Sequence, residues 1–265
     1  FTKIHNTLLA DLPLHQFWYD KTIGFDFSAS NINAGGDDKN GYWVTCTWTL
    51  RFKPAKAFKG SKTFAVSQTK IKKVQTAASN AKAVVKKYAS KSDRAKLLAY
   101  KEYLCKNIDY NYDAVTDLST PYGNPWQLIW AFDKDPSTKV VCEGYSKAFQ
   151  YLCDLSTFKD STISCYSVTG NSTFYYNGVN TGGGPHMWNI VTRKGKKYLV
   201  DVTNCDSDDG VGDVGLFLKG KASGTVAKGY NVKSVNGLTV KYTYAADTKN
   251  IYSTKELTLA NSAWK

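Results

Sequence analysis

The most restrictive feature of the sequence is an aspartate inside an apolar, strand-like run, residues 198–203 (YLVDVT), in which Asp201 is the acid. A carboxylate among apolar side chains is costly to bury unless it gains a partner. The fold is therefore expected to bring a hydrogen-bonding or charged group to Asp201.

The preceding apolar run, Pro185 to Thr192, offers that partner in His186. The two runs, 185–192 and 196–203, read as neighbouring strands, and Lys194-Gly195 between them suits a two-residue hairpin turn. This turn would make Asp201 a diagonal neighbour of His186 on the same sheet face, with about 7–8 Å between their backbones. A register one residue different would separate them.

A third candidate is Cys142, which follows Val140-Val141 and precedes a helical pattern. Apolar residues at helical spacing (Tyr145, Ala148, Phe149, Leu152, Cys153) predict a helix that begins near Cys142. The thiolate is the nucleophilic form of a cysteine, and a helix N-terminus and a nearby imidazolium both favour that form. Taken alone, such a cysteine is more typical of a small buried hydrophobe.

Together the three residues form a recognisable constellation. An aspartate that accepts from one imidazole nitrogen fixes the tautomer and leaves the other nitrogen for the thiol. The order Cys142, His186, Asp201, with the cysteine opening a helix and the others on strands, predicts a papain-like arrangement of nucleophile, base and orienting acid.

Residues 141–153 (VCEGYSKAFQYLC) resemble the nucleophile helix of the bacterial transglutaminase-like superfamily. Residues 186–191 (HMWNIV) are similar to its His-Ala-Trp-Asn strand, and 198–203 to its Tyr-x-Val-Asp-x-Thr strand. Weaker similarity to exported Firmicute members extends over about residues 8 to 220, in segments 11–13 (DLP), 17–19 (FWY), 107–110 (NIDY) and 217–219 (FLK). In two places the chain departs from the family: Asn204-Cys205-Asp206 stands where Trp-Asp-Asp is usual, and Met187 where alanine is usual.

The resemblance implies acyl transfer through a Cys142 thioester on peptide or glutamine carboxamide groups, resolved by water or by an amine. Hydrolysis by a cysteine peptidase or amidase is favoured over protein crosslinking, because many bacterial members resemble proteases. It implies a second oxyanion donor upstream of the nucleophile; Tyr110 is the candidate by motif position, with Trp126 and Gln127 as alternatives. Trp188 is expected to wall the cleft.

The pattern of the whole chain predicts an α+β fold. Residues 1–68 form a β-rich region by their period-two alternation, 69–220 the papain-like transglutaminase core, in which the nucleophile helix packs on an antiparallel sheet, and 221–265 a C-terminal β extension. Within the core, 70–107 changes to helical spacing, with Ser92 as N-cap of a second helix, and 171–184 reads as a loop rich in Gly, Asn and Tyr.

Charge suggests a second function. Residues 51–106 contain 16 Lys or Arg against two acids, within a chain of net charge +13. Such a block attracts polyanions. It lacks the interleaved aromatics of a nucleic-acid binder, which favours anionic cell-wall polymer or an acidic protein surface. A non-catalytic cell-surface module that binds through this block is the alternative to an enzyme; a solvated helical face is the simplest interpretation.

Six cysteines without a CxxC pair argue against a structural zinc site, and no cofactor is indicated. If one cysteine stays a thiol, at most two disulfides form among the other five, and the sequence does not give their connectivity. No apolar run approaches the roughly 18 residues of a membrane span. The β-rich composition and the start at Phe1 predict an exported protein, secreted or at the cell surface, whose leader has been removed.

Overall fold

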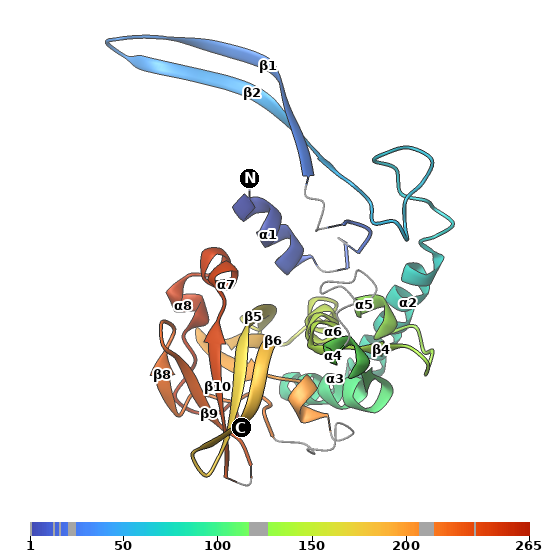
Figure 1. Cartoon of the computed structure of the whole chain (residues 1–265), viewed down its shortest axis with the longest axis vertical. Helices are drawn as coiled ribbons and strands as arrows, with labels where there is room; N and C mark the ends of the chain where they lie inside the picture. Colours follow the sequence, from blue (N-terminus) through green and yellow to red (C-terminus); the bar gives the residue numbers. More distant parts are fainter. Residues whose placement is uncertain are drawn as a thin grey trace. The chain divides into compact units, whose positions relative to one another are not determined.

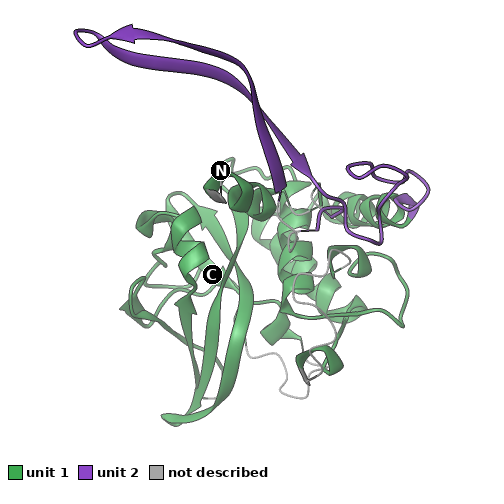
Figure 2. Cartoon of the chain, turned by 45° about the horizontal axis from the view of Figure 1, so that its top comes forward, with its two compact units in different colours: residues 1–16, 73–265 green, residues 17–72 purple. Residues whose placement is uncertain are grey.

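The structure is a computed structural model, and it describes residues 2–12, 14–15, 17–20, 25–116, 127–206, 215–235 and 237–265. The chain divides into two compact units, residues 17–72 and residues 1–16 with 73–265 (Figure 2). The division at 68 predicted from sequence therefore falls close to one unit boundary, whereas the first 16 residues belong to the larger unit.

The smaller unit is built on an antiparallel hairpin of β1 (Phe25–Asp37) and β2 (Gly41–Phe52). The alternation seen in the sequence reappears as two unlike faces. Phe27 pairs with Leu50 and Ala29 with Trp48, whereas the intervening pair is Ser28 with Thr49. Because directly paired residues share a face, the hairpin has one apolar and one polar face. The strands expected from period-two alternation here are confirmed.

The first residues differ from the β-rich prediction, since α1 (Thr2–Asp11) is a helix. The segment contains Leu8, Leu9 and Ala10, which are good helix formers. It also packs on other parts of the larger unit: α1 contacts β5 and α7, and Gln150 Nε2 donates to the carbonyl of Ala10 at 2.9 Å. The β-rich prediction is therefore wrong for residues 2–11, where helix-forming residues and contacts with β5 and α7 favour a helix.

Two long helices, α2 (Lys72–Tyr88) and α3 (Asp93–Asn107), confirm the helical spacing of 70–107. Ser92 occupies the predicted N-cap position of α3 but makes no side-chain cap. The carboxylate of Asp93 instead accepts from the backbone N–H groups of Lys159 and Asp160, both at 2.9 Å. The residue next to the predicted cap therefore ties α3 to the segment after α6.

Short elements then lead to the nucleophile helix. They are β3 (Asp109–Tyr110), α4 (Asp113–Thr116), α5 (Gln127–Trp130) and β4 (Lys139–Val140). Strands β3 and β4 pair in parallel, and α6 (Cys142–Asp154) follows β4 after one residue. The predicted start at Cys142 is confirmed, and the five residues of the predicted apolar face of α6 are all buried.

A six-stranded antiparallel sheet, in the order β7-β6-β5-β10-β9-β8, forms the other layer of the larger unit (Figure 1). Its members are β5 (Ser164–Tyr176), β6 (Val179–Arg193), β7 (Lys196–Val200), β8 (Ser223–Thr225), β9 (Gly229–Lys233) and β10 (Leu238–Tyr244). Helix α6 packs on β5 and β6. Helices with an antiparallel sheet are compatible with the predicted α+β class.

The loop expected over 171–184 is wrong, because these residues complete the β5–β6 hairpin. Asn177 and Gly178 have φ of 49° and 82°, the positive values that a two-residue turn of the hairpin type requires. Glycines at 182 to 184 then continue β6 with little side-chain bulk. Residues 171–184 thus have a composition typical of loops but form part of two paired strands.

The C-terminal segment supplies β8, β9 and β10, so residues 221–265 complete the same sheet that carries His186. Two short helices, α7 (Ala246–Ile251) and α8 (Thr254–Leu257), end the chain. Ser253 and Glu256 form a reciprocal capping box at α8, which satisfies backbone N–H groups at its start.

The basic block 51–106 does not form one continuous feature. Residues 51–72 belong to the smaller unit and the remainder to the larger one. Lys96 and Lys101 are buried, and Lys96 Nζ donates to the carbonyl of Thr157 at 2.7 Å. Part of the positive charge is therefore structural. None of the helices in the described residues is both long and apolar enough to cross a bilayer.

Gly144, in the first turn of α6, gives the fold a testable constraint. A methyl group at this position would overlap the side chain of Val140. Replacing a helical glycine with alanine normally stabilises a protein by about 1 kcal/mol. We expect Gly144→Ala to lower the free energy of unfolding in urea by about 1–3 kcal/mol instead, because the overlap pushes α6 away from β4.

Val140→Gly removes the Cβ and both methyl groups that the new methyl group would meet. The loss in the double variant should therefore be smaller than the sum of the two single losses. An additive result, or a stabilised Gly144→Ala protein, would contradict the close packing of α6 on β4.

Candidate active site

His186 on β6 and Asp201, directly after β7, meet as the hairpin geometry predicts. The ladder pairs Asn189 with Val200 and Arg193 with Lys196, the register that a Lys194-Gly195 turn gives. His186 Nε2 lies 2.8 Å from Asp201 Oδ2, and both side chains are buried. The predicted strand 196–203 is shorter than expected, because β7 ends at Val200 and Thr203 lies in a 3₁₀ turn.

The Asp201 carboxylate collects further donors. Its Oδ2 accepts from Tyr242 Oη at 2.6 Å and from Asn204 Nδ2 at 2.7 Å. Its Oδ1 lies 3.2 Å from the backbone nitrogen of Asn204, the bond that an aspartate makes when it starts a turn. Asp201 thus ends β7, opens the 3₁₀ turn (η1, Thr203–Cys205) and holds His186.

These contacts set the charges of the pair. Burial alone would raise the pKa of Asp201, but the positive charge of His186 and the bonds from His186, Tyr242 and Asn204 hold that pKa below its ordinary value. Burial alone would lower the pKa of His186, but the charge and hydrogen bond of Asp201, with a smaller effect of the neighbouring Cys142, raise it well above its ordinary value. The favoured state at neutral pH is an imidazolium beside a carboxylate.

Cys142 completes the contact. It is the first residue of α6, it is buried, and it lies close enough to His186 to be among the groups that raise the pKa of this imidazole. Because His186 Nε2 faces Asp201, Nδ1 is the nitrogen left for the sulfur. The first N–H groups of a helix have no intrahelical partner and carry partial positive charge, and Cys142 stands at this end of α6.

A polar seam holds α6 on the sheet beside this contact. Ser146 Oγ donates to the carbonyl of Met187 at 2.8 Å, and Asn189 Nδ2 donates to the carbonyl of Ser146 at 2.9 Å. Further along, Gln150 Oε1 accepts from the hydroxyl and the backbone N–H of Ser167 at 2.7 and 2.9 Å. The helix that carries Cys142 is therefore fixed to the strand that carries His186.

Trp188 lies behind His186 rather than along an open cleft. Its side chain is fully buried, and its ring stacks on the imidazole with centroids 6.1 Å apart and planes 17° from parallel. Tyr242 and Tyr244 contact the other parts of the indole. Trp188 thus supports the histidine from the core, which differs from its predicted place in the cleft wall.

The oxyanion candidates are placed differently from one another. Tyr110 pairs with Val140 in the β3–β4 ladder and stacks on Tyr145. Gln127 is buried at the start of α5, and its Oε1 accepts from the N–H of Val141, the residue before Cys142, at 2.9 Å. Trp126 lies outside the described residues.

Sequence reasoning missed Tyr242 and the role of Asn204. Tyr242 stands in the alternating run of β10, whose parity places it with the buried Val240 and Tyr244, but a strand pattern does not say which buried residue faces it across the sheet. In the sequence, Asn204 stands out only as a departure from the motif that residues 198–203 resemble. Asn204 Nδ2 in fact lies 3.3 Å from His186 Nε2 as well as against Asp201.

Within the described residues, no group of three or more His, Cys, Asp or Glu side chains is arranged to hold a metal ion.

The charge state of His186 is directly testable by NMR titration of the imidazole C–H signals. We expect the His186 signal to keep its imidazolium position well above pH 6.5, the ordinary midpoint of a histidine. In Asp201→Asn the opposing charge is gone, burial outweighs the smaller effect of Cys142, and the midpoint should fall below 6.5. The signals of His5 and His15 are internal controls.

The pKa shifts of His186 and Asp201 also determine how the free energy of unfolding depends on pH. The raised pKa of His186 contributes stability that is fully present below about pH 6.5 and lost as pH rises through the folded value. The lowered pKa of Asp201 contributes above about pH 3.9 and is lost as pH falls through its folded value. The difference in unfolding free energy between wild type and Asp201→Asn should peak between these limits; a pH-independent difference would contradict the ion pair.

No family model matches the chain, and no curated protein matches it. Among solved structures, one described as the "Crystal structure of a TGase" aligns with a TM-score of 0.35 and 17% sequence identity, over 69% of this chain and 45% of that protein. The chain thus spans less than half of that protein's length, and a likeness of this size carries no argument about fold or function.

Proposed function

We propose that the protein is an enzyme that transfers acyl groups through a Cys142 thioester, with His186 as proton carrier and Asp201 as the residue that orients it. The observation that carries the proposal is the position of one imidazole, which lies 2.8 Å from Asp201 and close enough to Cys142, the first residue of α6, for this cysteine to raise its pKa. The proposal includes the finer fold assignment, a papain-like or transglutaminase-like core in which α6 packs on β5 and β6.

The reaction begins with the Cys142 thiolate beside protonated His186. The sulfur attacks the carbonyl carbon of a peptide bond or glutamine carboxamide, a C–S bond forms, and the carbonyl oxygen becomes an oxyanion. His186 then gives its proton to the leaving nitrogen as the C–N bond breaks, which leaves a thioester and releases an amine or ammonia. Water or an amine attacks the thioester next, His186 takes the proton of this nucleophile, and the C–S bond breaks.

The proposed oxyanion site is the start of α6. The N–H of Cys142 belongs to the helix-terminal donors that have no intrahelical acceptor. Gln127 is the better supported second donor, since its amide group already lies against Val141. Tyr110 is the candidate from motif position. It pairs across the β3–β4 ladder with Val140, which lies two residues before Cys142.

The proposed substrates are proteins or peptides, and hydrolysis is the proposed outcome, with amine transfer as the competing one. We also propose that the protein acts outside the cell or at its surface. Binding of an anionic cell-wall polymer by residues 51–106 is a separate proposal, which rests on the exposed lysines of α2, among them Lys72, Lys73, Lys82 and Lys86.

Selective alkylation tests the thiol. At pH 6 an ordinary thiol is almost entirely protonated, so it reacts slowly with iodoacetamide. We expect Cys142 to react about 10- to 100-fold faster than a free thiol of this kind, because the imidazolium stabilises the thiolate while a more stable thiolate is somewhat less nucleophilic. Mass spectrometry of the tryptic peptide 140–147 measures the rate at this cysteine alone.

His186→Ala should remove the enhancement, whereas His15→Ala, which removes an exposed histidine, should leave it unchanged. If Cys142 reacts no faster than an ordinary thiol at pH 6, the enzyme proposal fails and the binding proposal gains.

The acyl acceptor is tested with casein and a labelled primary amine in one reaction. We expect casein cleavage or deamidation to exceed amine incorporation, and Cys142→Ala to abolish all three. Incorporation as the main product would replace hydrolysis with crosslinking while keeping the thioester. No reaction, despite a reactive Cys142, would reject casein-type substrates.

A further inference from the structure

Two cysteines that the proposed mechanism does not use lie side by side in the larger unit. Cys153 is in the last turn of α6 and Cys165 is the second residue of β5. Both are buried, with 4% and 6% of their surface exposed. Helix α6 contacts β5, and Cys165 lines the same cavity as Gln150 and Asp154, the residue after Cys153.

Their proximity follows from the polar seam. Gln150 on α6 and Ser167 on β5 are joined by two hydrogen bonds. Cys153 lies three residues further along the helix, so it shares the face of Gln150. Cys165 lies two residues earlier on the strand, so it shares the face of Ser167. The two bonds between Gln150 and Ser167 therefore place Cys153 and Cys165 on the facing sides of α6 and β5.

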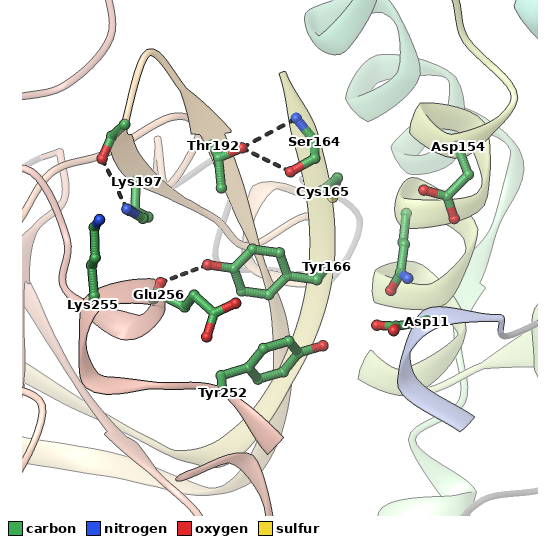
Figure 3. A pocket seen from close by; sticks show the side chains of 12 residues that line it. Asp11, Asp154, Ser164, Cys165, Tyr166, Thr192, Lys197, Tyr252, Lys255 and Glu256 are labelled. Atoms are coloured by element: carbon green, nitrogen blue, oxygen red, sulfur yellow. Dashed lines mark hydrogen bonds between the residues drawn. The ribbon is translucent and has the colours of Figure 1, made fainter. Parts of the chain in front are cut away.

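Cys165 is also reached from a pocket. A cavity of about 600 Å³ opens at the end of α6 against β5 and β6, and Cys165, Ser164, Tyr166 and Thr192 are among its lining residues (Figure 3). Burial, followed by the effect of the neighbouring Cys153, raises the pKa of Cys165. The folded dithiol is therefore poorly nucleophilic, and exchange is expected to be fastest while the chain folds.

We propose that Cys153 and Cys165 are a disulfide site, which a small-molecule disulfide oxidises so that the end of α6 becomes covalently joined to β5. One thiolate attacks the oxidant and releases one small thiol, which forms a mixed disulfide. The second thiolate displaces the other small thiol and forms the S–S bond. The two cysteines lose two protons and two electrons in total, and the oxidant is reduced to two thiols.

The bridge stabilises by restricting the unfolded chain across residues 154–164. The bridge would join α6 to β5, the two elements that the bonds between Gln150 and Ser167 also join. Helix α6 begins with Cys142, and β5 pairs with β6, the strand that carries His186. The bridge leaves Cys142 as a thiol, since the oxidised pair lies at the opposite end of the helix. Neither sulfur takes part in acyl transfer, so this proposal stands apart from the proposed function.

The test refolds the full chain in a mixture of oxidised and reduced glutathione, blocks remaining thiols, and maps tryptic peptides without reduction. Trypsin cuts after Lys147, Lys159 and Arg193, so Cys153 and Cys165 fall in separate peptides, 148–159 and 160–193. We expect these two peptides to be recovered joined, lighter than their sum by two hydrogen atoms, and separated by dithiothreitol.

The same linkage should form in Cys142→Ala, and Cys165→Ala should abolish it. Reduction should lower the urea midpoint of unfolding in wild type and leave Cys153→Ala/Cys165→Ala unchanged. Wild-type peptide mapping needs no variant, so a variant that fails to fold does not spoil the test. Recovery of both cysteines as blocked thiols, or their linkage to other cysteines, would overturn the proposal.

Discussion

The larger unit depends on one buried carboxylate. Asp201 is fully buried among apolar strands, and the free-energy cost of burying its charge without a partner would be prohibitive. Four contacts remove this penalty: His186, Tyr242, and the side chain and backbone of Asn204. They come from β6, β10 and the 3₁₀ turn, so a single charge draws together segments that are far apart in sequence. Removing one donor therefore weakens both the fold and the position of the histidine.

The position of Cys142 depends on a different set of bonds. Packing of the apolar face of α6 gives the helix its place on the sheet, but apolar contact alone tolerates small slides and rotations. The bonds of Ser146 with Met187 and Asn189, and of Gln150 with Ser167, are directional, so they select one position of α6 on β5 and β6. Proton transfer between the Cys142 thiol and His186, as proposed, requires that accuracy, because a hydrogen bond between two groups is lost over about 1 Å.

Sequence reasoning succeeded where one local rule had a single consequence. The Lys194-Gly195 turn fixes the parity of β6 and β7, the apolar spacing after Cys142 fixes the buried face of α6, and an acid in an apolar strand demands a partner. It failed at the Asn177-Gly178 hairpin, where a composition typical of loops belongs to paired strands. It also failed where the structure of a segment depends on a contact with residues far away in the sequence. No local pattern in 238–244 shows that Tyr242 faces Asp201, and α1 is helical through contacts with β5 and α7.

The donors around Asp201 also bear on the chemistry. Oδ2 is shared by His186, Tyr242 and Asn204, and each additional donor makes this oxygen a weaker base. A weaker base leaves the proton on the imidazole while its negative charge still stabilises the imidazolium. Asn204, at a position where the sequence departs from the motif that it resembles, contributes to this balance. The departure therefore lies in the residues that tune the histidine, while Cys142, His186 and Asp201 themselves match that motif.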